Sequence, residues 1–176
     1  MTPYWFLFLL PVFGALIPLR LEYRSRLLSF LILSLTSISI MGFRNEIGGD
    51  WIPYLTYLNG VSGKGLLESI AHYRYVEPGF IAINWLCETL GFGIVGVNII
   101  GASILLLGVT TLSKNQPLPY LALLVSVPYL IIVVGIGYSR QAIALGIILI
   151  ALSTWNRKDF LFLECITVTV QSEYII

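Results

Sequence analysis

Long apolar runs alternate with short polar connections along most of the chain. Each of five runs approaches the roughly 20 residues that a helix needs to cross a bilayer. The five runs cover residues 3–19, 27–43, 93–112, 118–134 and 141–155. A sixth apolar run, 160–170, is too short to cross fully. The pattern predicts an all-α fold, a polytopic integral membrane helix bundle with five transmembrane helices and an incomplete sixth.

One polar stretch, from about residue 44 to 78, follows the second apolar run. Two short helices are predicted inside it. The first starts after Asp50, has Pro53 in its first turn, and ends at Gly60. The second covers 66–75, after a flexible GVSGKG link, and a further short helix is expected over 79–90. We therefore expect a single membrane domain, 1–176, with short helices in an outer polar loop.

The composition also indicates a membrane protein. Hydrophobic residues make up 57% of the chain and charged residues 11%, whereas about a quarter of the residues in a typical soluble domain are charged. The formal net charge is +1 and the basic residues form no contiguous patch, so no nucleic-acid partner is expected. Cys87 and Cys165 lie far apart without a CxxC spacing, and we interpret them as inert core thiols.

The basic residues indicate how the helices are oriented, because short cytoplasmic loops carry an excess of Lys and Arg. If the five spans alternate, one side of the membrane receives Arg20, Arg24, Arg26, Lys114, Arg157 and Lys158. That side is assigned to the cytoplasm. The 44–78 loop and the 135–140 turn then face outward, together with the basic residues Arg44, Lys64, Arg74 and Arg140.

Arg44 and Arg140 each allow two interpretations. They can end helices at the interface, with their stems along lipid and their charges in water. Alternatively, they converge on an anionic ligand at the outer surface. A guanidinium binds phosphate oxygens in a bidentate manner, and such charge-assisted hydrogen bonds contribute roughly 1.5–3 kcal/mol each.

Two acids in the polar loop are also open to two interpretations. Asp50 fits an N-cap, but Asp50, Tyr54 and Tyr57 are spaced i, i+4, i+7. This spacing places a carboxylate and two phenol rings on one helix face, an arrangement that suits a sugar. Glu77 precedes Pro78 and can be an N-cap or an acid at the mouth of a membrane cavity.

His72 is the only histidine in the chain. Histidine titrates near neutral pH, which makes His72 a candidate general base. The alternative is an interfacial hydrogen-bonding role among tyrosines and arginines.

No set of side chains has the spacing of metal ligands, so we expect neither a metal nor another cofactor. In the last span, Ala142 and Gly146 form a small-residue spacing that lets another helix approach closely.

Three short motifs in a fixed order carry a resemblance to a known family. They are Arg44-x-x-x-Gly48-x-Asp50-Trp51-x-x-Tyr54, then Glu77-x-Gly79-Phe80, then Gly137-Tyr138-Ser139-Arg140-Gln141-x-x-Ala144. Together, in a membrane context, they resemble the EpsG family of bacterial polysaccharide polymerases, whose role is related to that of Wzy-type polymerases.

The resemblance implies a glycosyltransferase-type membrane enzyme of exopolysaccharide, capsule or O-antigen synthesis. Such an enzyme joins oligosaccharide repeat units carried on undecaprenyl diphosphate at the outer face of the bacterial cytoplasmic (inner) membrane. The implied partners are this lipid-linked oligosaccharide, membrane lipid and other polysaccharide assembly proteins.

The resemblance also implies roles for individual residues. Asp50 or Glu77 would accept the proton of the incoming hydroxyl, and Arg140 would stabilise the diphosphate charge that develops as the bond breaks. The implied substrate-binding residues are Arg44, Trp51, Tyr54, Tyr57, His72, Arg74 and Gln141.

The chain departs from the family pattern at its end. Family members usually continue through several more spans and a further His-containing segment, whereas this sequence stops at QSEYII. We therefore expect an incomplete bundle that is inactive or poorly folded alone.

Two other functions stay open, a flippase for a lipid-linked glycan and a non-catalytic truncated membrane subunit that pairs through its unfinished sixth helix. A transporter needs polar groups in the middle of the membrane. Tyrosines aside, the interiors of the spans 93–112 and 118–134 offer only Asn98, Ser103 and Ser126. This scarcity argues against transport.

Overall fold

The computed structural model describes residues 2–16 and 23–154. Its elements are α1 (Thr2–Leu16), α2 (Tyr23–Gly42), α3 (Trp51–Val61), α4 (Leu66–His72), α5 (Pro78–Thr89), α6 (Gly93–Lys114), α7 (Pro119–Ser126), the π-helix η1 (Val127–Gly135) and α8 (Ser139–Ser153). Every regular element in these two ranges is a helix, which confirms the predicted all-α fold. The sixth apolar run and the basic residues Arg20, Arg157 and Lys158 lie outside the described residues.

Five helices stand where the apolar runs predicted them, namely α1, α2, α6, α7 continued by η1, and α8. Two of them are long and apolar enough to cross a membrane, Arg24–Gly42 in α2 and Gly93–Lys114 in α6. The other three are shorter apolar helices. The number of five membrane spans therefore stays a prediction.

The polar loop forms the short helices that its sequence predicted, with small differences at their ends. α3 begins directly after Asp50 and continues one residue past Gly60. α4 ends at His72, three residues earlier than predicted. α5 begins at Pro78, whose missing N–H is not needed in the first turn of a helix.

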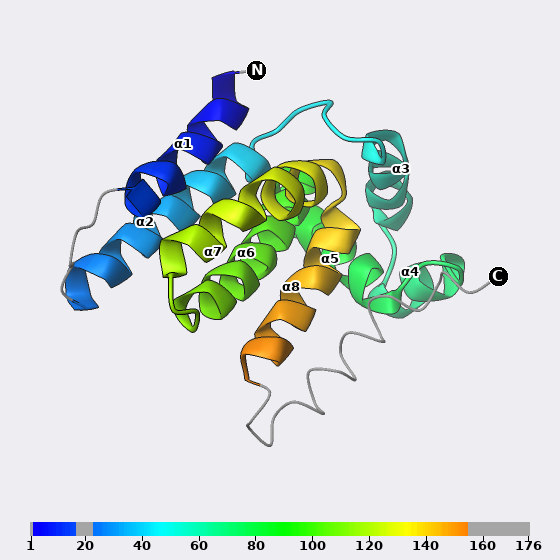
Figure 1. Cartoon of the computed structure of the whole chain (residues 1–176). Helices are drawn as coiled ribbons and strands as arrows, with labels where there is room; N and C mark the ends of the chain where they lie inside the picture. Colours follow the sequence, from blue (N-terminus) through cyan, green and yellow to red (C-terminus); the bar gives the residue numbers. More distant parts are fainter. Residues whose placement is uncertain (1, 17–22, 155–176) are drawn as a thin grey trace.

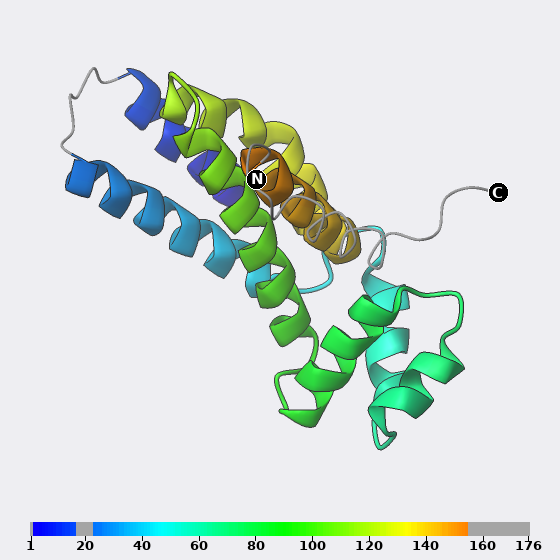
Figure 2. The same cartoon turned by 90° about the horizontal axis from the view of Figure 1, so that it is seen from below.

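The five apolar helices lie side by side, and α3, α4 and α5 lie beyond one end of them (Figures 1 and 2). The 43–50 loop and the 136–138 turn are at this end, which we call the loop end. The α6–α7 turn and the first residues of α2 are at the opposite end. α6 occupies the centre of the bundle, where it contacts α2, α5, α7 and α8.

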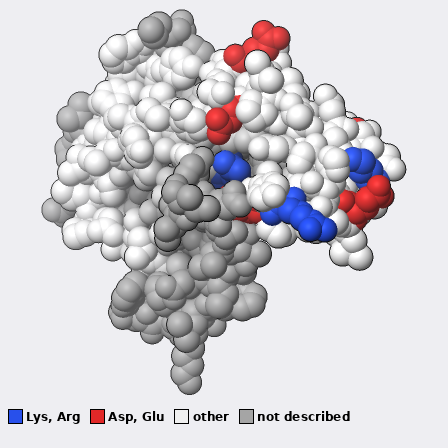
Figure 3. Space-filling model, turned by 90° about the vertical axis from the view of Figure 1, so that its right-hand side faces the viewer, with Lys and Arg blue, Asp and Glu red and all other residues white. Residues whose placement is uncertain are grey.

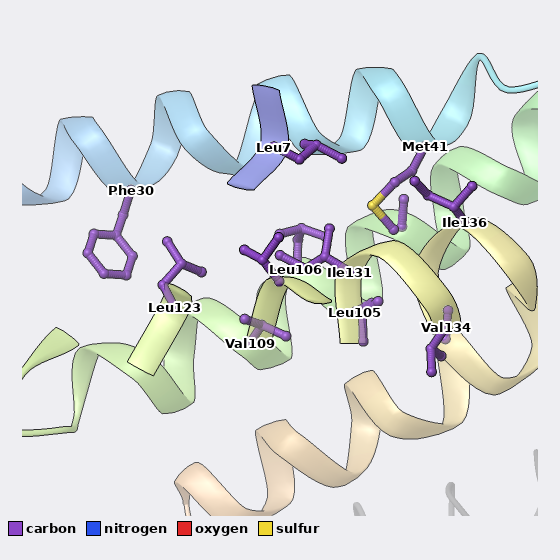
Figure 4. Packing of buried hydrophobic residues seen from close by; sticks show 13 residues of the cluster. Leu7, Phe30, Met41, Leu105, Leu106, Val109, Leu123, Ile131, Val134 and Ile136 are labelled. Atoms are coloured by element: carbon purple, nitrogen blue, oxygen red, sulfur yellow. The ribbon is translucent and has the colours of Figure 1, made fainter. Parts of the chain in front are cut away.

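The larger buried cluster joins α1, α2, α6 and the α7–η1 helix. Figure 4 shows Met41 of α2 extending into the space between Leu105 of α6 and Ile136, which follows η1. Methionine fills such irregular space because its unbranched side chain adapts to its surroundings. Lipid tails are as apolar as these side chains, so close packing, and not release from water alone, favours this core within a membrane.

A second buried cluster fastens the short helices to the bundle. It contains Tyr54 and Leu58 of α3, Phe80 and Cys87 of α5, Val97 of α6, and Ile143 and Ala144 of α8. The rings of Tyr54 and Phe80 lie 5.3 Å apart between centroids. This cluster sets the position of α3 and α5 against the start of α8.

The α7–η1 helix changes its winding at Val127. Residues 127–135 form the π-helix η1, in which each hydrogen bond reaches one residue further than in an α-helix. Pro128 provides a reason, because it has no N–H to donate to the preceding turn. π-Helical turns are frequent at functional sites, and this one leads directly to the loop end.

α6 and α8 approach so closely that their backbones touch at two glycines. A Cβ on Gly146 would lie 2.5 Å from the carbonyl oxygen of Ile104, and a Cβ on Gly108 would collide with the carbonyl oxygen of Gly146. Small residues permit such contact between membrane helices. The contact confirms the close approach that the small-residue spacing predicted.

Replacing Gly146 by alanine should therefore destabilise the bundle. The added methyl group meets backbone atoms, and overpacking of this kind costs about 1–3 kcal/mol. Gly65→Ala is the matched control, because a Cβ at Gly65 meets no atom within 4 Å. Thermal unfolding in detergent micelles should show a lower Tm for Gly146→Ala alone. Equal Tm values for both variants and the unchanged protein would contradict the close helix contact.

Candidate functional site

The loop end is built from two backbone segments that pack on each other, the 43–50 loop and the 136–138 turn. Gly48 has a φ of +113°, a backbone conformation that favours glycine. A Cβ on Gly48 would lie 2.5 Å from the carbonyl oxygen of Gly137. Glycine at position 48 is therefore needed both for its backbone angle and for the close approach.

Arg44 lies inside this junction, where it is only 6% exposed. Its Nη1 donates to the carbonyl oxygens of Gly135, at 2.9 Å, and Ile136. Its Nη2 donates to Asn98 Oδ1, at 3.0 Å, and to Ser139 Oγ. The Ser139 hydroxyl in turn donates to Asn98 Oδ1 at 2.8 Å. One guanidinium thus contacts α6, η1 and α8 at once.

The position of these acceptors explains why a cation is favourable here. The carbonyls of Gly135 and Ile136 lie at the C-terminal end of η1, where helix carbonyls lack partners and carry partial negative charge. Burial lowers the pKa of Arg44, but an arginine stays charged at neutral pH. The charge is therefore held inside the protein by helix carbonyls.

Neither sequence interpretation describes where Arg44 lies. The guanidinium is buried inside the protein, and its four hydrogen bonds go to groups of the protein. The predicted role as a substrate ligand needs a guanidinium that reaches the outer surface. We assign Arg44 a positioning role instead.

Asp50 and Glu77 occupy the N-cap positions of α3 and α5, but neither carboxylate caps its helix. The hydroxyl of Tyr54 donates to Asp50 Oδ2 at 3.1 Å. Nη1 of Arg140 donates to Glu77 Oε2 at 3.3 Å, and this ion pair is 6% exposed on the Glu77 side and 23% on the Arg140 side. The N-cap interpretation therefore describes the position of both acids but not the direction of their carboxylates.

Tyr54 connects Asp50 to the start of α8. Its hydroxyl accepts a hydrogen bond from the backbone N–H of Arg140 at 3.3 Å while it donates to Asp50. The side chain is 2% exposed, and burial raises its pKa, so the phenol keeps its proton at neutral pH. A tyrosine buried this deeply does not offer a ring face to a sugar, and we assign it a positioning role as well.

The structure thus brings four predicted site residues together at the first turns of α3, α5 and α8. They are Asp50, Tyr54, Glu77 and Arg140. Helix N-termini carry partial positive charge and exposed N–H groups. The guanidinium of Arg140 pairs with Glu77, and Tyr54 links Asp50 to the backbone of Arg140. A cation and a second carboxylate near the starts of three helices can bind an anion and accept a proton within one site.

The other predicted binding residues lie on α3, at the end of α4, in the turn that follows α4, and near the start of α8. Trp51 and Tyr57 are half-buried, and His72, Arg74 and Gln141 are exposed. On the face of the molecule shown in Figure 3, basic and acidic side chains lie near one another on one half of the described surface. These positions leave the five side chains accessible to a large polar ligand.

Asn98 and Ser139 complete the site, although the sequence alone did not single them out for this role. They are 3% and 2% exposed. Asn98 stands inside an apolar run, and a buried amide requires hydrogen-bond partners. This requirement is the signal that could have marked Asn98 as part of a buried hydrogen-bond network.

Replacing Arg44 by methionine should strongly destabilise the loop end. The carbonyls of Gly135 and Ile136 lose this donor, and each buried acceptor left unsatisfied costs about 1–3 kcal/mol. Arg44→Lys should lose less stability than Arg44→Met, because an ammonium keeps the charge but not the planar arrangement of donors. Unfolding in detergent micelles measures both changes, with the exposed Arg24→Met as the matched control. An Arg44→Met variant as stable as the control would contradict the assigned role.

Comparison with known proteins agrees with the motifs from which the resemblance was inferred. The EpsG family model matches residues 27–176. No curated protein and no solved structure matches the chain. The matched range contains Arg44, Asp50, Glu77 and Arg140, together with α3 to α8. It covers most of the sequence, and the chain belongs to the EpsG family.

Proposed function

We propose that the protein is a membrane glycan polymerase that joins oligosaccharide repeat units carried on undecaprenyl diphosphate. Membership in the EpsG family supports a role in polysaccharide biosynthesis at a membrane. One observation carries the more specific proposal. Asp50 and Glu77 do not cap their helices. Glu77 bonds to the guanidinium of Arg140, and Asp50 bonds to Tyr54, whose hydroxyl accepts from the backbone N–H of Arg140.

We place the loop end at the outer face of the cytoplasmic membrane. Arg24 and Arg26 in the first turn of α2 and Lys114 in the last turn of α6 lie at the opposite end, and such residues favour the cytoplasmic side. Arg44 and Arg140 go against this trend, but each has a local partner within the protein. Their position is therefore compatible with an outward-facing loop end.

Arg140 is proposed to bind the diphosphate of the growing lipid-linked chain. As the bond between the anomeric carbon and the diphosphate oxygen breaks, negative charge develops on that oxygen. A guanidinium already held in place stabilises this charge most strongly in the transition state. Glu77 provides the hold through its 3.3 Å ion pair, so we propose that it positions Arg140.

Asp50 is proposed as the proton acceptor. A hydroxyl oxygen of the incoming repeat unit forms a bond with the anomeric carbon while the bond to diphosphate breaks, and the hydroxyl proton passes to the carboxylate. Asp50 is half-buried and has the neutral hydroxyl of Tyr54 as a partner, whereas Glu77 is buried against a cation. Asp50 is therefore the acid more accessible to the acceptor hydroxyl.

The accessible side chains around the site are proposed to contact the sugars. Trp51 and Tyr57 offer aromatic surface with a polar edge. His72, Arg74 and Gln141 offer hydrogen bonds at exposed positions. Contacts of this kind hold a repeat unit near the reacting bond without taking part in the reaction.

Arg140→Gln should shorten the polymer in a strain that lacks its own copy of the gene. Loss of one charge-assisted contact, about 1.5–3 kcal/mol, corresponds to roughly 10- to 150-fold slower chain extension. Arg140→Lys should give a polymer length between those of Arg140→Gln and the unchanged protein, because lysine keeps one charge without the bidentate geometry. Arg24→Gln, at the opposite end of the bundle, is the matched control and should leave polymer length unchanged. Gel electrophoresis of the glycan gives the lengths.

The same experiment separates the other functions. Single repeat units should still reach the outer leaflet in the Arg140→Gln strain, and their loss would favour a flippase. Unchanged polymer length at normal expression would contradict the ligand role of Arg140. A polymer length that does not depend on the gene at all would favour a non-catalytic subunit.

A further inference from the structure

An open apolar groove of about 630 Å³ lies between α1 and η1. Its side walls are Tyr4, Trp5 and Phe8 from α1 and Pro128, Ile132 and Val133 from η1. Trp5 is 62% exposed and Val133 45% exposed, so the groove is open along the side of the helix bundle. Its lining suits a hydrocarbon chain and offers almost nothing to a polar ligand.

The groove reaches the loop end at the 136–138 turn. Its remaining wall residues are Ile47, Ile136 and Gly137. The carbonyl of Ile136 accepts a hydrogen bond from Arg44, and Arg140 follows Gly137 by three residues. The turn that closes the groove therefore also begins the helix that carries Arg140.

A second open groove provides a comparison. It has about 670 Å³ and lies between α6, α7 and α8, with Leu121, Val125 and Leu149 in its wall. It ends at Gln116 and Pro117 in the α6–α7 turn, away from the loop end. Both grooves therefore share size and apolar lining. Of the two, only the α1–η1 groove reaches the 136–138 turn, from which α8 and Arg140 follow.

We propose that the α1–η1 groove binds the isoprenoid tail of the polyprenyl diphosphate whose phosphates Arg140 binds. This inference rests on the proposed function and adds the place of the lipid. The diphosphate is bonded directly to the first isoprene unit, so the tail leaves the site along the nearest apolar surface. Binding of the tail then holds the diphosphate, and with it the reacting anomeric carbon, in one orientation.

Val133→Trp tests the groove, because it fills the groove from η1 and leaves the site residues unchanged. The probes are undecaprenyl diphosphate and geranyl diphosphate, each titrated into the protein in detergent micelles. Displacing two methylene groups from an apolar site corresponds to roughly tenfold in affinity. Val133→Trp should therefore weaken undecaprenyl diphosphate binding about tenfold or more and leave geranyl diphosphate binding unchanged. Val125 lies in the second groove and is 70% exposed. Val125→Trp is the matched control and should change the affinity for neither probe.

Other outcomes overturn the proposal in distinguishable ways. Val133→Trp and Val125→Trp could weaken the binding of undecaprenyl diphosphate equally, or phosphatidylglycerol could displace undecaprenyl diphosphate as well as added undecaprenyl diphosphate does. Either result would show that the groove takes membrane lipid of any kind. Equal affinity of the unchanged protein for both probes would show that the tail is not bound, while the proposed function would stand. Binding of neither probe, or binding that is unaffected by Arg140→Gln, would contradict the proposed function and this inference together.

Discussion

The loop end depends on the buried guanidinium of Arg44. A helix C-terminus, the start of another helix and an amide of a central helix meet there, where they are shielded from water. Polar groups in such a place require partners within the protein. A planar side chain with five N–H donors can serve four acceptors at once, which an ammonium cannot do with the same geometry. The break between η1 and α8 is stable because this side chain fills it.

The position of Arg44 also decides what the neighbouring acids do. By joining the 43–50 loop to the first turn of α8, it brings α3 close enough for Tyr54 to bridge Asp50 and the backbone of Arg140. Asp50 and Glu77 then forgo capping bonds, which typically contribute about 1 kcal/mol each. Local losses of stability of this size are common at functional sites. The two carboxylates are thereby held by Tyr54 and Arg140 and do not cap their own helices.

Local properties of the chain could be predicted, and long-range partners could not. Apolar runs located the long helices, because span length and composition are local, and the i, i+4 spacing placed Asp50 beside Tyr54 for the same reason. The role of Arg44 escaped prediction because its partner carbonyl at Gly135 is 91 residues away, and every residue carries a carbonyl. The π-helical winding after Pro128 likewise depends on tertiary packing as well as on sequence.

Arg44 and Arg140 thus have separate tasks, since Arg44 holds the loop end together and Arg140 is proposed to bind the ligand. An experimental structure of the protein bound to undecaprenyl diphosphate tests this division most directly. We expect the phosphate oxygens on the guanidinium of Arg140, with Arg44 still bonded to the carbonyls of Gly135 and Ile136. A diphosphate bound by Arg44, with those carbonyl bonds broken, would contradict it.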